Sequence, residues 1–429
     1  MSRSLRRTLV ALLSFTLLVS IGATGLAQEP IVITFWKHSH PPADPLTEEL
    51  IAEFEAANPG VDIQMELISS ADYINRVLTA AAGGQLPDIF DINDANHAIL
   101  TGNGILAPVD VAAFGFESQE DFEAAYVPDS LNPFKGEDGQ VYGIPFEYNS
   151  WIMVINENMF REIGLDPETD YPKTWEEVGE IGGQIATVNN GVFERQGFAW
   201  NLVTPGWTML LFSPLVYQGG GSILTDDDMG DACALNEPAG VAALQTMQDM
   251  YYKYNAGAPG INLATAQDSM IDFYQDRMGM WILGPWAVPQ LTPVADHMRL
   301  IPLPQMTDAE RDVVMLSSWV WTVNAASEHT DIAWKFVDYA SQQGARWLPT
   351  AGYILPRIGW TDDPSVADFP GLDVFIDQMQ YGRPRLIHPR QGEIATIIHQ
   401  YVQDAILNNL DAQETLDSAC DEINAALAG

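Results

Sequence analysis

The sequence predicts an α/β fold divided into two domains. The chain of 429 residues is longer than a single hydrophobic core usually supports. Its hydrophobic content of 47% and its 12 tryptophans exclude a disordered or fibrous chain. Apolar strands alternate with helical segments, and this alternation begins twice, near residue 31 and again near residue 150. Strands separated by helices of this length predict mostly parallel sheets flanked by helices.

The first series of elements follows from periodicity and from start and stop signals. Residues 61–67 alternate apolar and polar side chains, as a strand with one buried side does. Asp44 is expected to cap a helix whose first helical position is Pro45, and Asn58 begins the stop signal Asn-Pro-Gly. The other expected elements are strands over 31–36 and 88–92 and a helix over 71–82.

In the second series the clearest signal is a capping box, Thr174-x-x-Glu177, which predicts a helix start. Another helix is expected to begin at Asn156, directly after a strand. The expected strands are 150–155, 278–283 and 318–323, and further helices are expected over 331–340 and 391–409.

The stretch from Ile144 to Asn156 reads as one apolar strand, except that its interior Glu147-Tyr-Asn-Ser150 is polar. A carboxylate and an amide inside a buried strand need partners to offset the cost of burial. These side chains therefore indicate a special role for the segment.

Residues 1–27 have the order of a secretory signal peptide, cleaved after Ala27. Three arginines precede an apolar run over 9–21, and small residues follow. The run is shorter than the ~20 apolar residues that a membrane-spanning helix needs. No cysteine follows it, so no lipid anchor is expected, and the protein is predicted to be exported to the periplasm or the extracellular space.

Acidic residues dominate the charge, which is formally −39. Removing residues 1–27 leaves 16 Lys and Arg against 58 Asp and Glu, a formal charge of −42. Such a surface repels nucleic acid and anionic lipid headgroups, and neither is expected as a partner.

Cys233 and Cys420 are the two cysteines of the chain. An exported compartment permits a disulfide between them. Alternatively, Cys420 is a buried thiol, because it shares the apolar face of a helix with Leu416 and Ile423. Their spacing does not resemble a zinc site.

Five stretches together resemble the extracellular solute-binding proteins of ABC importers, in the carbohydrate-binding branch that includes maltose-binding protein. The most specific spans 141–178, with Tyr-Gly-Ile-Pro, a strand ending in Asn, and Pro-x-Thr-Trp-x-Glu. The others are "QLPDIFDIN", "LVYQGGGSIL", "FYQDRMGMWILGPW" and "HTDIAWKFVDYASQQGARWLPTAGYILPR". They occur in the family's order, behind a signal peptide. The sequence departs from the family at Ile155, where a tyrosine is common.

The resemblance implies a two-lobe periplasmic-binding-protein-like fold with the ligand cleft between the lobes. The expected first lobe is 28–146 plus 319–358, and the second is 147–318 plus 359–429. Glu147 to Ser150 would then cross the hinge beside the cleft, and Ser317 to Trp319 would form a second crossing. Closure on a ligand is a hinge motion.

Strand ends and crossings, where open α/β sheets place ligands, supply the candidate ligand-binding residues. A sugar needs flat aromatic faces and amides or carboxylates that hydrogen-bond in the plane of its ring. The candidates are Trp36, His38, His40, Asn93, Asp94, Glu147, Asn149, Trp207, Tyr217, Trp286, Trp319, Tyr353 and Arg357.

Most candidates also have a structural interpretation. The tryptophans and Tyr217 could pack in a core, and the two histidines could be solvated in a loop. Asn93 or Asp94 could cap a helix, and Arg357 could form a surface ion pair. A metal held by the histidines is not expected, because no third ligand is evident.

One basic cluster, "YGRPRLIHPR", contains Arg383, Arg385, His388 and Arg390. In so acidic a chain it could simply balance local charge. Alternatively, Arg383 and Arg385 could bind an acidic ligand such as a uronic acid or a phosphorylated polyol, because guanidinium groups match carboxylate and phosphate geometry.

The sequence therefore predicts a monomeric, non-enzymatic receptor that binds a carbohydrate and delivers it to ABC permease subunits, with no cofactor, metal or catalytic residue. The alternatives are a receptor for an acidic or phosphorylated polyol, a secreted glycoside hydrolase that would need two suitably spaced carboxylates, and a surface lectin or adhesin without a transporter.

Overall fold

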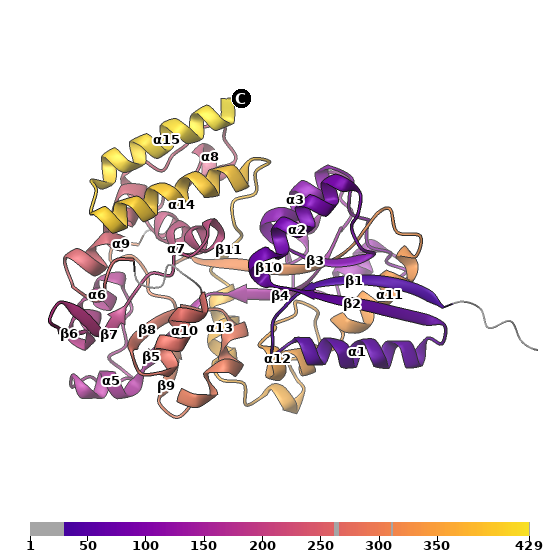
Figure 1. Cartoon of the computed structure of the whole chain (residues 1–429), viewed down its shortest axis with the longest axis horizontal. Helices are drawn as coiled ribbons and strands as arrows, with labels where there is room; N and C mark the ends of the chain where they lie inside the picture. The colour runs from indigo at the N-terminus through magenta and orange to yellow at the C-terminus, as the bar shows by residue number, and fades with distance from the viewer. Residues whose placement is uncertain (1–29, 261–265, 310–311, 429) are drawn as a thin grey trace, which may run out of the picture.

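A computed structural model describes residues 30–260, 266–309 and 312–428. The predicted signal peptide lies outside the described residues. The chain forms two α/β lobes side by side (Figure 1), each with its own sheet and hydrophobic core. The two-lobe α/β fold predicted from the sequence is confirmed.

The first lobe is built on a sheet with the strand order β11-β10-β3-β1-β2, in which β4 also pairs with β10. Strand β1 runs parallel to β2 and β3, whereas β10 runs antiparallel to β3 and β4. The strands are β1 (Ile31–His38), β2 (Val61–Ile68), β3 (Ile89–Asn93), β4 (Ile144–Ser150), β10 (Val314–Val323) and β11 (Gly382–Arg383).

Helices flank this sheet because their apolar stripes pack on its hydrophobic faces. Leu50 and Phe54, from one such stripe, are buried in the first core. The helices are α1 (Asp44–Ala57), α2 (Ser70–Gly83), α3 (Asp94–Gly102), α4 (Gln119–Glu123), α11 (Thr330–Ser341) and α12 (Gly344–Ala351), with the 3-10 turn η1 (Asn132–Phe134).

The second lobe contains a sheet of order β6-β7-β8-β5-β9. The expectation of a mostly parallel sheet is wrong here. Strand β5 is antiparallel to both β8 and β9, and β6 is antiparallel to β7, whereas β7 and β8 are parallel. Because the chain enters this lobe from β4, β5 runs against the strands that follow the helical crossovers. The strands are β5 (Ile152–Asn156), β6 (Thr187–Asn189), β7 (Val192–Phe198), β8 (Met278–Leu283) and β9 (Met298–Ile301).

The second lobe is richer in helices, which enclose a core that includes Phe212, Trp281 and Ile398. Its helices are α5 (Glu157–Glu162), α6 (Trp175–Ile185), α7 (Pro205–Gln218), α8 (Thr225–Asp228), α9 (Pro238–Tyr252), α10 (Ala266–Tyr274), α13 (Leu372–Met379), α14 (Gln391–Asn408) and α15 (Ala412–Ala428), with the 3-10 segments η2 (Pro285–Val294) and η3 (Pro364–Val366).

Strands β4 and β10 connect the two cores. Phe146 and Trp321 are buried in the first core, whereas Trp151, just after β4, and Met315 are buried in the second. The two strands pair with each other along the crossing, with a register shift between Trp319 and Val320. Figure 1 shows both strands running between the lobes.

Local capping signals were mostly read correctly. The capping box of Thr174 and Glu177 starts α6, and Asn156 caps α5 by accepting a hydrogen bond from the Met159 backbone. The expected cap at Asp44 is wrong, because the N-cap of α1 is Ala43. The Asp44 carboxylate is engaged instead by the buried Lys37 ammonium, 2.7 Å away.

A disulfide joins Cys233, in the loop after α8, to Cys420 of α15. The same loop is held to α15 by a hydrogen bond from the Cys233 backbone to the Asn424 side chain, 2.8 Å long. Within residues 30–260, 266–309 and 312–428, no helix combines the length and the apolar composition needed to cross a membrane.

Candidate functional site

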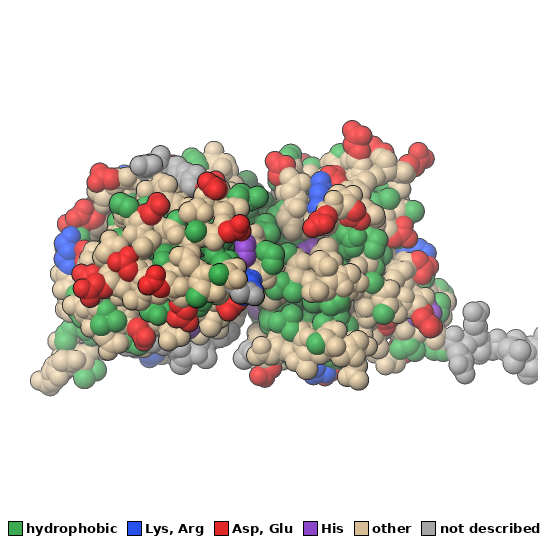
Figure 2. Space-filling view, turned by 90° about the horizontal axis from the view of Figure 1, so that it is seen from above, with side chains coloured by type: hydrophobic (Ala, Val, Ile, Leu, Met, Phe, Trp, Pro, Cys, Tyr) green, Lys and Arg blue, Asp and Glu red, His purple; other side chains and the backbone are tan. Residues whose placement is uncertain are grey.

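A crevice separates the two lobes and is visible from above in Figure 2. It contains a cavity of about 260 Å³. The first lobe lines this cavity with the start of α3 and with η1, and the second lobe lines it with residues 382–391. Tyr148 of β4 and Ser318 of β10 lie between these two walls. The cavity is therefore bounded by both lobes and by the strands that connect them.

The carboxyl end of β1 carries a buried ionisable group at the crossing. His38 Nδ1 lies 2.8 Å from Asp91 Oδ2, and its ring stacks on Trp319 with a centroid separation of 3.8 Å. His38 Nε2 lies 3.9 Å from Glu147 Oε1, which is close enough for charge interaction but too far for a hydrogen bond. This contact ties the end of β1 to the crossing strand β4.

Glu147 and Asn149 of β4 are buried and point to the same side of the strand. Asn149 Nδ2 donates to Glu147 Oε2 at 3.0 Å. Burial raises the pKa of Glu147, against the opposing effects of His38 and of the Asn149 hydrogen bond. Asn149 Oδ1 is buried and has no hydrogen-bond partner among the described residues, so this acceptor is unsatisfied.

His40 lies between the lobes. Its Nδ1 is 2.8 Å from the Tyr353 hydroxyl, and its ring stacks on Tyr353 and meets Trp286 of the second lobe edge-on at 6.4 Å. Burial, with repulsion from His38 and Lys37, lowers the pKa of His40 to about 3. The imidazole is therefore neutral at physiological pH. Its buried Nε2 is another polar atom for which the described part of the chain supplies no partner.

Aromatic rings continue from His40 into the second lobe. Trp286 contacts Trp207 edge-on at 6.3 Å, and Trp207 contacts Trp151 at 5.1 Å. The turn before Trp286 comes very close to Gly352, where a Cβ would lie 2.0 Å from the Pro285 carbonyl oxygen. Only glycine fits this approach, which brings Trp286 against the first lobe.

An ion pair crosses the crevice. Arg385 Nη2, beside residues of the second core, lies 2.6 Å from Asp94 Oδ1 at the start of α3. Asp94 also accepts hydrogen bonds from the backbone N–H groups of Ala95 and Ser318. Burial raises the pKa of Asp94, while Arg385 opposes that shift. Arg385 Nε is buried, again without a partner in the described residues.

Asn93 caps α3 and accepts from the Asn96 backbone at 3.1 Å. Four other candidates do not join the group around the crevice. Trp36 lies under the Arg76 guanidinium, at 4.3 Å. Tyr217 is buried and donates to Asp228.

The remaining two candidates are arginines paired within a single lobe. Arg383 pairs with Asp227 and Asp228. Arg357 pairs with Asp338 in the first lobe. The structure therefore separates Arg383 from Arg385, although they are two positions apart in the sequence.

Two polar features near the crevice escaped sequence reasoning. Asn201, just beyond the carboxyl end of β7, is buried with both side-chain polar atoms unpaired within the described ranges. Thr208 of α7 bonds His399 of α14 at 2.7 Å. The position of Asn201 after a strand was a usable signal, whereas the Thr208–His399 contact depends on how two distant helices pack.

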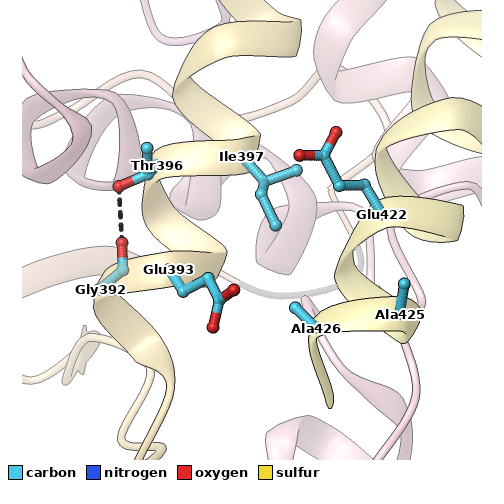
Figure 3. Close-up of a pocket in the computed structure, with 7 residues that line it drawn as sticks. All are labelled: Gly392, Glu393, Thr396, Ile397, Glu422, Ala425 and Ala426. Atoms are coloured by element: carbon cyan, nitrogen blue, oxygen red, sulfur yellow. Dashed lines mark hydrogen bonds between the residues drawn. The ribbon is translucent and has the colours of Figure 1, made fainter. Parts of the chain in front are cut away.

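A separate surface hollow of about 560 Å³ lies between α14 and α15 (Figure 3). Its lining combines the carboxylates of Glu393 and Glu422 with small and aliphatic residues. This lining lacks the aromatic faces of the crevice. In the described part of the chain, no group of three or more His, Cys, Asp or Glu side chains is placed to hold a metal ion.

The two lobes, the connecting strands and the crevice between them define the architecture of a solute-binding protein. The chain belongs to the bacterial extracellular solute-binding protein family, whose model matches residues 39–347.

Three similar proteins illustrate the family. An ABC transporter solute-binding protein of Thermotoga lettingae, bound with alpha-D-tagatose, is 23% identical, with a TM-score of 0.78 and coverage of 92% of this chain and 100% of that one. Maltose-bound MalE3 of T. maritima is 19% identical, with a TM-score of 0.80 and coverage of 93% and 99%. The sn-glycerol-3-phosphate-binding periplasmic protein of Salmonella typhimurium is 21% identical over 99% of this chain and 98% of its own.

Proposed function

We propose that this protein is an exported, non-enzymatic receptor that binds a carbohydrate in the crevice and delivers it to the permease subunits of an ABC transporter. The observation that carries the proposal is the combination of aromatic rings with three buried, unpaired polar atoms at the crevice. Those atoms are His40 Nε2, Asn149 Oδ1 and Arg385 Nε, each unpartnered among the described residues.

This combination matches the chemistry of a sugar. The C–H faces of a sugar pack on rings such as Trp286 and Trp207, while its hydroxyls both donate and accept hydrogen bonds. A ligand hydroxyl can donate to Asn149 Oδ1 and accept from Arg385 Nε. Buried polar atoms are costly to leave unpaired, so a ligand that satisfies them gains stability that water-exposed groups could not provide.

Hinge closure follows from the same architecture. We place the lobe boundaries at 28–146 with 319–358 and at 147–318 with 359–429. Under this division β4 and β10 carry the hinge, and the sugar is enclosed as the lobes approach each other. The sugars bound by the tagatose and maltose proteins support a carbohydrate ligand.

An acidic or phosphorylated polyol is the second candidate, favoured by the similarity to the glycerol-phosphate-binding protein. Only Arg385 of the two predicted arginines lies at the crevice cavity, because Arg383 is engaged by Asp227 and Asp228. A glycoside hydrolase is the remaining alternative, since the raised pKa of Glu147 would suit a general acid.

A ligand screen tests the proposal. The purified chain without residues 1–27 should show a higher melting temperature with at least one of D-tagatose, maltose, maltotriose or mannotriose, because ligand bound to the folded state adds stability. At 100 times the dissociation constant the gain is about 2.7 kcal/mol. Tryptophan fluorescence should shift with the same sugar, without product in a chromatographic assay. No response to any neutral sugar, or release of product, would refute the proposal.

A further inference from the structure

The ion pair between Asp94 and Arg385 determines the charge that the crevice accepts. Three residues with ionisable charge line the cavity: Asp94, Asp129 and Arg385. The carboxylates therefore outnumber the guanidinium group in this lining. The chain as a whole, at −39, adds to the negative potential.

Asp94 is held in place by more than Arg385. Its Oδ2 accepts from the Ser318 backbone at 3.0 Å, and its Oδ1 accepts from the Ala95 backbone at 2.8 Å. Both donors belong to regular secondary structure, so the carboxylate cannot easily turn away from an incoming ligand. A ligand that approaches Arg385 therefore meets Asp94 as well.

The consequences differ for neutral and anionic ligands. A hydroxyl can donate to Asp94 and accept from Arg385 Nε, so it uses both groups without breaking their pair. A carboxylate or phosphate would place a second negative charge beside Asp94 in a buried site, where such charges repel strongly. It would also have to compete for a guanidinium that is already neutralised.

We propose that Asp94 is a specificity-determining residue that excludes sugar acids and sugar phosphates, so that the ligand is an uncharged polyhydroxy sugar. This inference rests on the proposed carbohydrate function. Asp94 acts through repulsion of the wrong ligand while Arg385 supplies attraction, which is how many binding sites achieve selectivity. Replacing the carboxylate by an amide removes the repulsion and leaves the positive charge of Arg385 uncompensated.

The test measures binding by calorimetry with neutral and anionic probes. The neutral probes are maltose, maltotriose, mannotriose and D-tagatose, and the anionic probes are maltose 6-phosphate, D-tagatose 6-phosphate, D-glucuronate and sn-glycerol 3-phosphate. The wild type should bind a neutral probe and reject the anionic ones. Asp94→Asn should bind at least one anionic probe about tenfold or more tighter than the wild type does, since repulsion is replaced by attraction. In Asp94→Asn/Arg385→Gln that gain should disappear.

Asp338→Asn is the matched control. Asp338 and Arg357 form an ion pair inside the first lobe with side chains 16% and 15% exposed, close to the 14% and 13% of Asp94 and Arg385. This control should gain no affinity for anions, and thermal melting establishes that each variant folds.

Three results overturn the inference while the receptor function stands. These are wild-type binding of an anionic probe as tightly as of a neutral one, no gain in Asp94→Asn, and a gain that persists in the double variant. If the wild type binds no neutral probe at all, the proposed function fails and the inference fails with it.

Discussion

Trp286→Ala should weaken sugar binding by about 10- to 150-fold, the largest effect we expect from a single substitution at the crevice. Trp286 contacts His40 of the first lobe and Trp207 of the second. Removing a large aromatic side chain from a buried contact costs about 1.5–3 kcal/mol, which corresponds to that loss of affinity. Calorimetric titration with the neutral sugar that gives the largest thermal shift measures the change.

Trp36→Ala serves as the control for this substitution. Trp36 is also a tryptophan of the first lobe, but its ring packs under Arg76 rather than toward the crevice. Its removal should leave sugar affinity within about twofold of the wild type, because surface contacts of this kind contribute little. Equal losses in the two variants would show that Trp286 has no special part in binding.

Removing the Cys233–Cys420 disulfide should produce the largest loss of stability. The bond closes a loop with a sequence separation of 187. Long closed loops restrict the unfolded chain most, and losing a native disulfide typically costs about 2–5 kcal/mol. The double substitution Cys233→Ser/Cys420→Ser should therefore lower the melting temperature by roughly 4–20 °C.

Reduction provides an independent check on this prediction. Dithiothreitol should lower the melting temperature of the wild type toward that of the double variant and leave the double variant unchanged. Sugar affinity should be retained at temperatures where the variant is folded, because the bond lies between the α8 loop and α15, away from the residues that line the crevice cavity. A double variant as stable as the wild type would contradict the expected contribution.

The order and type of many elements could be predicted from local sequence. The capping signals at Asn156 and Thr174 involve residues within three positions of each other, so they are visible without knowledge of the fold. The two-lobe fold itself came from a resemblance spread over five stretches. Periodicity alone carries no information on strand direction, which explains why the antiparallel pairing of β5 was not predicted.

The site was harder to predict because its contacts join distant parts of the chain. Arg383 and Arg385 looked equivalent in sequence, yet one pairs with Asp228 and the other with Asp94 across the crevice. Asp44 looked like a helix cap, but the fold places the buried Lys37 beside it. Local patterns identify polar residues at strand ends, and only the packing of the two lobes decides which of them meet.

Small-angle X-ray scattering tests the central claim most directly, namely that two lobes joined by β4 and β10 close on a sugar. The wild type is measured without ligand and with a saturating concentration of the sugar selected by thermal shift. Our account predicts a distance distribution that becomes narrower with sugar, together with a smaller radius of gyration. Identical scattering curves, obtained with a sugar whose binding calorimetry has established, would contradict closure of the lobes.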